Sequence, residues 1–166
     1  MEMRNAEPAA TAIVEAHGVT REFKVGGGIV RALRGIEARI EPGELVALRG
    51  RSGSGKTTLL NILTGIDSPT QGQVHLLGHD LARLNETARA ILRREQVGIL
   101  FQNAHLFPLL TAQENTELPL RLARLLAALL QRIAHEQGIG MLVATHDPVV
   151  VTSADRVLTI SDGMLV

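Results

Sequence analysis

Two stretches in the first quarter of the chain have apolar residues interspersed with polar ones and few turn-forming residues. These stretches, residues 13–23 and 29–40, are typical of β-strands, and three consecutive glycines, 26–28, lie between them. Glycines at this place predict a flexible hairpin turn, for which we favour an interpretation without a role in ligand binding. Residues 1–12 contain Ala, Glu and Pro without periodicity and predict a loose tail.

The rest of the chain alternates between short apolar strand patterns and helix patterns. Strands are expected over residues 45–48, 73–77, 97–101, 141–145 and 156–160. Helices are expected over residues 57–64, 85–96 and 120–137, and a short helix or turn over residues 148–154. The longest helix is expected to begin after Pro119. It has six apolar residues on one face, at Leu122, Leu125, Leu126, Leu129, Leu130 and Ile133. This alternation predicts one α/β domain over residues 13–166, with a parallel sheet, flanking helices and an N-terminal antiparallel β portion.

Residues 50–57 read Gly-Arg-Ser-Gly-Ser-Gly-Lys-Thr and match a phosphate-binding loop at every constrained position. Glycines let the backbone N–H groups converge on phosphate oxygens, and the following helix presents its positive end to the same anion. Lys56 is expected to reach the β- and γ-phosphates, and the Thr57 hydroxyl to bind Mg²⁺. The residues expected to bind the cofactor here are Gly50, Ser52, Gly53, Ser54, Gly55, Lys56, Thr57 and Thr58. A chance glycine turn is disfavoured, because the motif stands between a predicted strand and a predicted helix.

Composition restricts the partners. Seventeen basic residues balance seventeen acidic ones, so no long-range field attracts nucleic acid or an anionic membrane, and any phosphate affinity must be local. Cysteine is absent, which excludes disulfides and thiolate metal sites. No apolar run approaches the length of a membrane-spanning helix. If the chain works at a membrane, we expect another protein to hold it there.

Further segments follow the loop in the order of one family. The loop continues as Thr58-Leu59-Leu60-Asn61, and residues 65–72, 78–80, 97–102, 109–115, 144–147 and 154–163 come after it. Together they resemble the nucleotide-binding domain of ABC transporters from Ile13 onward. Residues 67–120 are most similar to the ATPases of lipoprotein-releasing and macrolide-export systems. The resemblance implies a P-loop NTPase fold and an ATP-binding subunit of an ABC-type export system.

The resemblance also implies roles for three residues outside the loop. Gln102 matches the Q-loop glutamine, which contacts the metal or the attacking water and senses the membrane partner. His146 matches the switch histidine near the γ-phosphate, and Phe23 matches the aromatic residue that stacks on adenine, although it could equally belong to the core. The implied cofactors are ATP and Mg²⁺. The implied partners are a membrane-spanning permease, which would place the chain at the cytoplasmic face of the membrane, and a second copy in a homodimer.

The sequence departs from the family between Gln102 and His146. The helical subdomain, the Leu-Ser-Gly-Gly-Gln signature and the Walker B strand with its aspartate and catalytic glutamate are missing. Residues 157–160 followed by Asp162 are not taken as Walker B, because they come after His146. Without the carboxylates, Mg²⁺ retention and hydrolysis are expected to be impaired, and a homodimer lacking the signature could not complete either site.

The junction is expected near Arg124 and Leu125, inside the predicted helix 120–137. This helix and the strands 97–101 and 141–145 could form one right-handed βαβ unit with the two strands as hydrogen-bonded neighbours. Two functions remain open at this point, an ATP-binding export subunit and a non-hydrolysing remnant or nucleotide-binding interaction module. A kinase or GTPase is disfavoured, because neither an acceptor-binding lid nor a guanine-reading Asn-Lys-x-Asp motif is visible.

Overall fold

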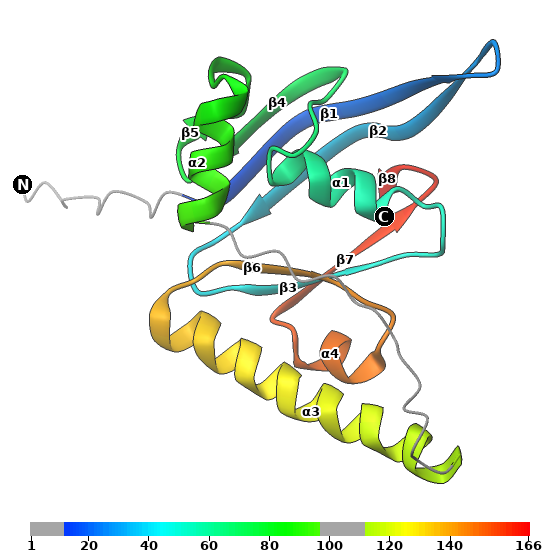
Figure 1. Ribbon diagram of the computed structural model, residues 1–166, viewed down its shortest axis with the longest axis vertical. Coiled ribbons are helices and arrows are strands. Elements are labelled where there is room, and N and C mark those ends of the chain that lie inside the picture. Colours follow the sequence, from blue (N-terminus) through cyan, green and yellow to red (C-terminus); the bar gives the residue numbers. More distant parts are fainter. Residues whose placement is uncertain (1–11, 97–111) are drawn as a thin grey trace, which may run out of the picture.

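The computed structural model describes residues 12–96 and 112–166, with side chains described over 12–94 and 124–166 (Figure 1). Two four-stranded sheets form the frame, one with strand order β2-β1-β4-β5 and the other with order β6-β3-β7-β8. Helix α1 lies between the sheets, and α3 and α4 lie on the opposite side of the second sheet (Figure 1). The predicted α/β class with an N-terminal antiparallel portion is confirmed.

The first sheet is antiparallel and begins with a long hairpin. Strands β1 (Val14–Val25) and β2 (Gly28–Ile40) pair along their length, and Gly26 and Gly27 connect them. Both glycines have positive φ, 54° and 81°, which is the conformation that a two-residue hairpin turn requires. On its other edge β1 pairs with β4 (Gln71–Leu76), which pairs with β5 (His79–Asp80). The predicted turn is therefore confirmed.

The second sheet centres on β3 (Leu45–Arg49). Its neighbours β6 (Met141–Ala144) and β7 (Arg156–Ser161) both run parallel to it, and β8 (Met164–Leu165) closes the far edge antiparallel to β7. The first four residues of β3 are at most 1% exposed. A strand that is paired on both edges and covered on both faces requires apolar residues at every position, which explains the unbroken apolar run in the sequence.

The helices of the described part are α1 (Lys56–Leu63), the 3₁₀ turn η1 (Leu81–Arg83), α2 (Glu86–Gln96), α3 (Ala112–Gln137) and α4 (Pro148–Ser153). Asn85 caps α2 as predicted, since its Oδ1 accepts from Ala88 N–H at 2.9 Å. Helix α3 starts eight residues earlier than expected, with Pro119 inside it. The prediction was wrong there, because proline removes one backbone hydrogen bond of a helix without having to end it. The expected junction at residues 124–125 falls within this one helix.

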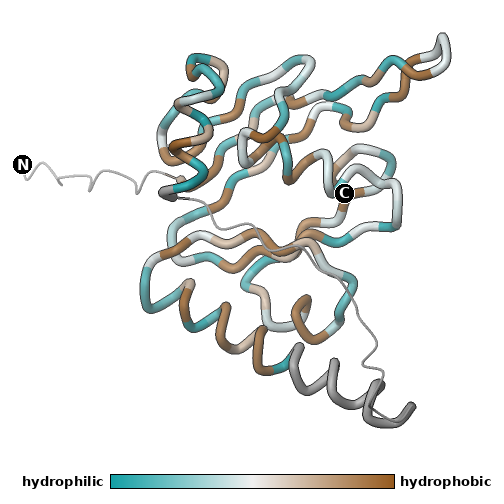
Figure 2. The backbone as a smooth tube through the Cα atoms, viewed as in Figure 1, coloured by the Kyte–Doolittle hydropathy of each residue, from teal (hydrophilic) through white to brown (hydrophobic). Residues whose placement is uncertain are grey.

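The main core lies between the first sheet, α1 and the second sheet. Its largest fully buried members include Val19, Leu33, Ile36, Val46, Leu48, Leu59, Ile62 and Ile160. Each such side chain contributes about 1.5–3 kcal/mol by burial. Figure 2 shows the hydrophobic segments of β3 and β6 lying between α1 on one side and α3 and α4 on the other. The segment between β3 and α1 is thus held at both ends by the core.

Two expectations concern residues outside the described part. The tail, residues 1–12, is described only at Ala12, which is 3% exposed, so packed structure already begins there. The strand expected over residues 97–101 is not described, and its pairing with β6 stays a prediction. The pairing that is described for β6 is the one with β3.

Candidate functional site

Residues 50–55 form a tight loop from the end of β3 to the start of α1. A Cβ added to Gly50 would lie 2.4 Å from the carbonyl oxygen of Ile160 on β7, and one added to Gly55 would lie 2.7 Å from that of Ala32 on β2. Gly55 also has φ 107°, which L side chains rarely adopt. Glycine is therefore required at both ends of the loop, because the backbones of two strands approach it closely.

A chain of backbone hydrogen bonds ties the loop to its neighbours. Gly163, in the turn between β7 and β8, donates to the carbonyl of Ser54 at 3.1 Å, and its own carbonyl accepts from Arg34 N–H on β2 at 2.8 Å. Ser54 is only 7% exposed, and its Oγ has no partner among the described residues. The loop is thus fixed against β2 and the β7–β8 turn, and Arg34 is held beside it.

Lys56, the first residue of α1, folds back over the loop. Its ammonium donates to the carbonyl of Gly50 at 2.6 Å and to that of Arg51 at 2.8 Å. An ammonium has three donors, so one remains for a further acceptor. The N-cap of α1 is Gly55, which offers no side-chain acceptor to the N–H groups of the first turn. A lysine and uncapped helix N–H groups at one place favour a bound anion.

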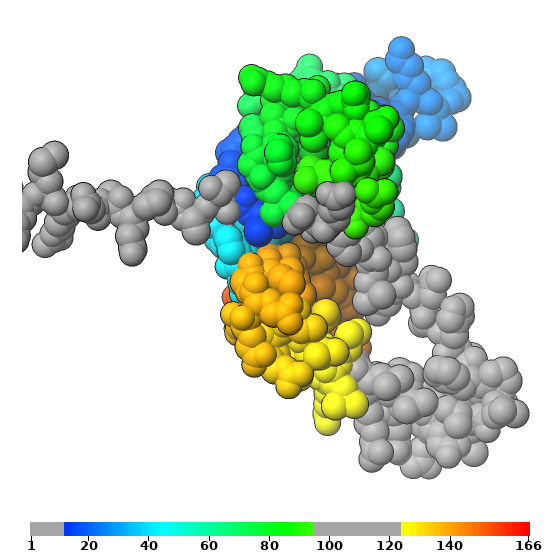
Figure 3. Space-filling model, turned by 60° about the vertical axis from the view of Figure 1, so that its left-hand side comes forward, coloured from blue at the N-terminus to red at the C-terminus, as the bar shows by residue number. Residues whose placement is uncertain are grey.

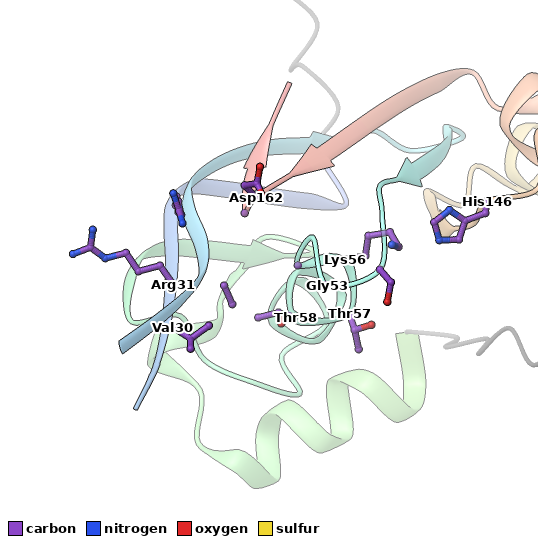
Figure 4. A pocket seen from close by; sticks show the side chains of 13 residues that line it. Val30, Arg31, Gly53, Lys56, Thr57, Thr58, His146 and Asp162 are labelled. Atoms are coloured by element: carbon purple, nitrogen blue, oxygen red, sulfur yellow. The ribbon is translucent and has the colours of Figure 1, made fainter. Parts of the chain in front are cut away.

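The loop borders a cavity of about 400 Å³, which lies within the usual range of ligand sites (Figure 4). Its walls come from β2, from the loop and the first turn of α1, from His146 after β6, and from the β7–β8 turn. The lining residues are Val30, Arg31, Ala32, Arg34, Ser52, Gly53, Gly55, Lys56, Thr57, Thr58, His146, Asp162 and Gly163. Segments far apart in the sequence therefore meet around one space.

Most residues predicted for the site line this cavity. They are Ser52, Gly53, Gly55, Lys56, Thr57, Thr58 and His146. Gly50 and Ser54 belong to the loop without lining the cavity, and Gln102 lies outside the described residues. Phe23 is 36% exposed and lies 4.6 Å from the Arg21 guanidinium, so it is neither in the core nor on the cavity wall. Its cross-strand neighbour Val30 lines the cavity instead, and the stacking role of Phe23 stays a prediction.

His146 is positioned by the residues on either side of it. Thr145 is 3% exposed and its N–H donates to the Leu48 carbonyl at 3.1 Å, which continues the pairing of β6 with β3. Asp147 donates its N–H to Thr145 Oγ1 at 3.0 Å and caps α4 by accepting from Val149 N–H at 2.8 Å. The imidazole itself is exposed and faces the side of the cavity where Lys56 lies (Figure 4). The backbone on both sides of His146 is fixed, whereas its side chain is accessible to a ligand.

Sequence reasoning missed three charged residues of the cavity, namely Arg31, Arg34 and Asp162. Asp162 has φ 49° in the turn after β7, and its neighbour Gly163 hydrogen-bonds to the loop. One signal was available for Asp162: turns that follow parallel strands gather at the same edge of a sheet. No comparable signal marks the arginines, which sit among other exposed residues on a long strand.

The described residues alone do not fit a magnesium ion. Thr57, the predicted ligand, is present in the first turn of α1, but Mg²⁺ normally takes one or two carboxylates as well. Figure 4 shows Asp162, which is the carboxylate that lines the cavity, well apart from Thr57. No group of three or more His, Asp or Glu residues in the described part could hold a metal ion. The other predicted ligand, Gln102, lies outside that part.

The opposite end of β3 carries a network of paired charges. Asp155 Oδ2 accepts from the Leu45 backbone N–H at 2.8 Å, and both its oxygens lie 3.0 Å from His135 Nε2. The Leu45 hydrogen bond, followed by that with His135, lowers the pKa of Asp155. Burial would raise the pKa of Glu44, but hydrogen bonds from Arg156, at 2.7 and 3.1 Å, and from the Glu41 N–H outweigh it, so this pKa is lowered too.

A glycine-rich loop that leads from the central strand of a parallel sheet into a helix, and ends in lysine and a hydroxyl residue, defines a P-loop nucleotide-binding domain. A family model described as "ABC transporter" matches residues 33–164. The chain therefore belongs to the ABC transporter family. No helix in the described part is long and apolar enough to cross a membrane.

Individual relatives point in the same direction. The macrolide export ATP-binding/permease protein MacB of Sodalis glossinidius is 48% identical over 109 residues, which are 66% of this chain and 17% of that protein. The lipoprotein-releasing system ATP-binding protein LolD of Anaeromyxobacter dehalogenans is 43% identical over 119 residues, 72% of this chain and 50% of that protein. The chain thus spans about a sixth of the first and half of the second.

A solved structure shares the fold. The ATP-binding cassette MJ0796, whose dimer was solved in a post-hydrolysis state with ADP and Pi, superposes with a TM-score of 0.74 at 26% identity. The superposition covers 92% of this chain and 96% of that one. The similarity to ABC ATPases therefore extends from the glycine loop to the arrangement of both sheets.

Proposed function

We propose that this chain is the ATP-binding subunit of an ABC-type export system and that it binds ATP through the loop at residues 50–57. The observation that carries this proposal is the meeting of Lys56, the uncapped first turn of α1 and His146 around one cavity. Phosphate binding needs converging N–H donors and a cation, and both are present there. The family match and the MacB and LolD relatives support ATP and export as the ligand and the process.

Each described site residue has a physical task in this proposal. The ammonium of Lys56 has one free N–H donor, which binds a phosphate oxygen. When ATP is bound, its hydrogen bonds to the loop carbonyls are replaced by hydrogen bonds to oxygens of the β- and γ-phosphates. The first-turn N–H groups of α1 and the loop amides bind the remaining phosphate oxygens. His146 approaches the terminal phosphate from the side of the cavity where Lys56 lies (Figure 4), and Thr57 is the described residue able to hold Mg²⁺ if the ion accompanies the nucleotide.

Hydrolysis is proposed to be weak. Phosphoryl transfer to water depends on a metal held beside the phosphates and on a group that orients the attacking water. Asp162 is the carboxylate on the cavity wall, and its place apart from Thr57 does not suit it to bind that metal (Figure 4). Gln102 and His146 are the residues proposed to act on the metal or the water, with Gln102 assigned by family resemblance alone. A nucleotide-binding module without turnover is therefore the second candidate function.

The partners in this proposal are a membrane-spanning permease and a second copy of the chain. MacB is named an ATP-binding/permease protein, LolD is the ATP-binding protein of a lipoprotein-releasing system, and MJ0796 was solved as a dimer. By analogy we place this chain at the cytoplasmic face of the membrane, held there by a permease. No nucleic acid is proposed as a partner.

Titration calorimetry with ATP and a phosphate-release assay on the purified chain test the proposal. Lys56→Ala is expected to weaken ATP binding by about a hundredfold or more. Lys24→Ala, which changes the chain's only other lysine, is the matched control and should bind like the unaltered chain. Lys24 is exposed near the hairpin tip. Binding without phosphate release favours the second candidate function. Failure of the unaltered, folded chain to bind ATP would refute both candidates.

A further inference from the structure

The fixed charges that line the cavity are mostly positive. The lining residues include three permanent cations, Arg31, Arg34 and Lys56, against one carboxylate, Asp162. Arg31 is partly neutralised, because its Nε donates to Glu22 at 3.0 Å across the hairpin. Arg34 and Lys56 therefore remain as cations that no carboxylate pairs in the described part of the chain.

Arg34 is held beside the loop. Its N–H donates to Gly163, which donates to Ser54, so one residue separates its backbone from the phosphate-binding loop. A Cβ at Gly163 would lie 2.7 Å from the Ala32 carbonyl, which shows how closely the turn packs against β2. The Arg34 side chain is exposed and lines the cavity, and no ion pair or hydrogen bond to it is found among the described residues. A guanidinium in this setting offers five donors to phosphate oxygens.

Lys56 and Arg34 differ in how their donors are used. Two of the three donors of Lys56 go to the carbonyls of Gly50 and Arg51, which are neutral and can be exchanged for charged oxygens. Together the two side chains can compensate two of the negative charges of a triphosphate. The described donor set for a metal, by contrast, consists of the Thr57 hydroxyl without a nearby carboxylate. Charge compensation by the protein is thus better provided for than compensation by a bound ion.

We infer that this cavity binds the triphosphate of a nucleotide as a free polyanion, with Arg34 and Lys56 in place of Mg²⁺, and that Arg34 is a binding residue for it. This inference rests on the proposed function, since it concerns the same cavity. It distinguishes this chain from a nucleotide site that depends on a metal for affinity. The ligand class is a nucleoside triphosphate or another linear polyphosphate without a metal.

The experiment compares ATP binding by the full chain in excess MgCl₂ and in excess EDTA, using titration calorimetry. The expected Kd values differ by less than about threefold, because a site without a carboxylate near Thr57 gains little from the ion. Sodium tripolyphosphate added in EDTA should displace ATP. Arg34→Gln should weaken ATP binding in EDTA by about tenfold, the size expected for one charge-assisted hydrogen bond, and Arg34→Lys should recover most of the loss.

Arg83→Gln is the matched control, because Arg83 lies on η1, outside the cavity, with 86% of its side chain exposed. Circular dichroism checks that each variant folds, and the MgCl₂–EDTA comparison on the unaltered chain decides the matter even if a variant does not. A Kd that rises tenfold or more in EDTA overturns this inference while leaving the proposed function intact. Absence of ATP binding in both buffers overturns both. If Arg34→Gln and the unaltered chain bind ATP with equal affinity in EDTA, Arg34 is not a binding residue.

Discussion

The two ends of strand β3 differ in how completely their polar groups are paired. At its amino end, Asp155 accepts from Leu45 and contacts His135, and Glu44 is bound by Arg156, so each charge has a partner. At its carboxyl end, the ammonium of Lys56 donates hydrogen bonds to backbone carbonyls, and the buried Ser54 Oγ has no hydrogen-bond partner among the described residues. Paired groups stabilise the native state without a ligand, whereas unpaired groups gain partners only when a ligand binds. Strand β3 thus has a structural end, where the charges are paired, and a proposed binding end, which borders the cavity.

The same division extends to the surroundings of the strand. Figure 3 shows the antiparallel portion with α2 stacked against the portion that contains β6 and α3. His135 on α3 belongs to the structural end of β3, and Arg34 on β2 belongs to the proposed binding end. The cavity therefore lies where the antiparallel portion meets the loop, and the paired charges lie where α3 meets the parallel sheet. The following substitutions test this difference.

The largest effect is expected for Gly50→Ala. The added Cβ would lie 2.4 Å from the Ile160 carbonyl, and backbone can move away only by separating β3 from β7, so we expect a loss of about 3 kcal/mol or more in the free energy of unfolding. Gly53→Ala is the control, because its Cβ would meet nothing within 4 Å and would suffer only from φ 79°, at about 1 kcal/mol. Urea unfolding measures both. Equal losses in the two variants would contradict the close approach at Gly50.

Lys56→Ala should separate binding from stability. We expect a loss of ATP affinity of about a hundredfold or more, which corresponds to about 2.7 kcal/mol. The free energy of unfolding should change by less than about 0.5 kcal/mol, because the lost hydrogen bonds go to exposed or half-buried carbonyls. Calorimetry and urea unfolding are carried out on the same preparation. A large loss of stability would show that the carboxyl end of β3 is structural as well.

Asp155→Ala should show the reverse behaviour. The Leu45 N–H is left without its carboxylate acceptor at a residue that is 0% exposed, and His135 loses its partner. We expect a loss of about 2 kcal/mol in the free energy of unfolding with an unchanged Kd for ATP. Asp80→Ala, which removes an acidic cap of η1 outside this network, is a control for losing one carboxylate. A changed Kd for ATP in Asp155→Ala would contradict the proposal that the two ends of β3 have separate roles.

The smallest effect is a dependence of stability on acid pH. The pKa values of Asp155 and Glu44 are lowered in the folded chain, so their contribution is present above the carboxyl pKa of the unfolded chain and is lost as the pH falls through the folded values. Thermal unfolding between neutral pH and about pH 3 should therefore show a decline that is shallower in Asp155→Asn. An identical pH profile for this variant would show that Asp155 does not contribute to it.

Much of the fold could be predicted because its signals are local. The apolar run at residues 45–48 indicated a buried strand, the glycines at 26–28 a hairpin turn, and Asn85 a helix cap, and each is found. The loop at residues 50–57 was recognisable because phosphate binding constrains adjacent residues. The start of α3 was placed wrongly, since a proline is a probabilistic boundary signal that the surrounding helix overrode.

The sequence by itself determined most of the described elements, the glycine-rich loop and the family, because the signals for them come from short runs of neighbouring residues. Tertiary structure decided which side chains share the cavity: it brought Arg34 and Asp162 to the loop and put Val30 rather than Phe23 on the wall. It also decided that Asp155 and His135 meet at the other end of β3. These contacts depend on strand register and on turns that meet at one edge of a sheet. No local pattern of residues specifies either of these features.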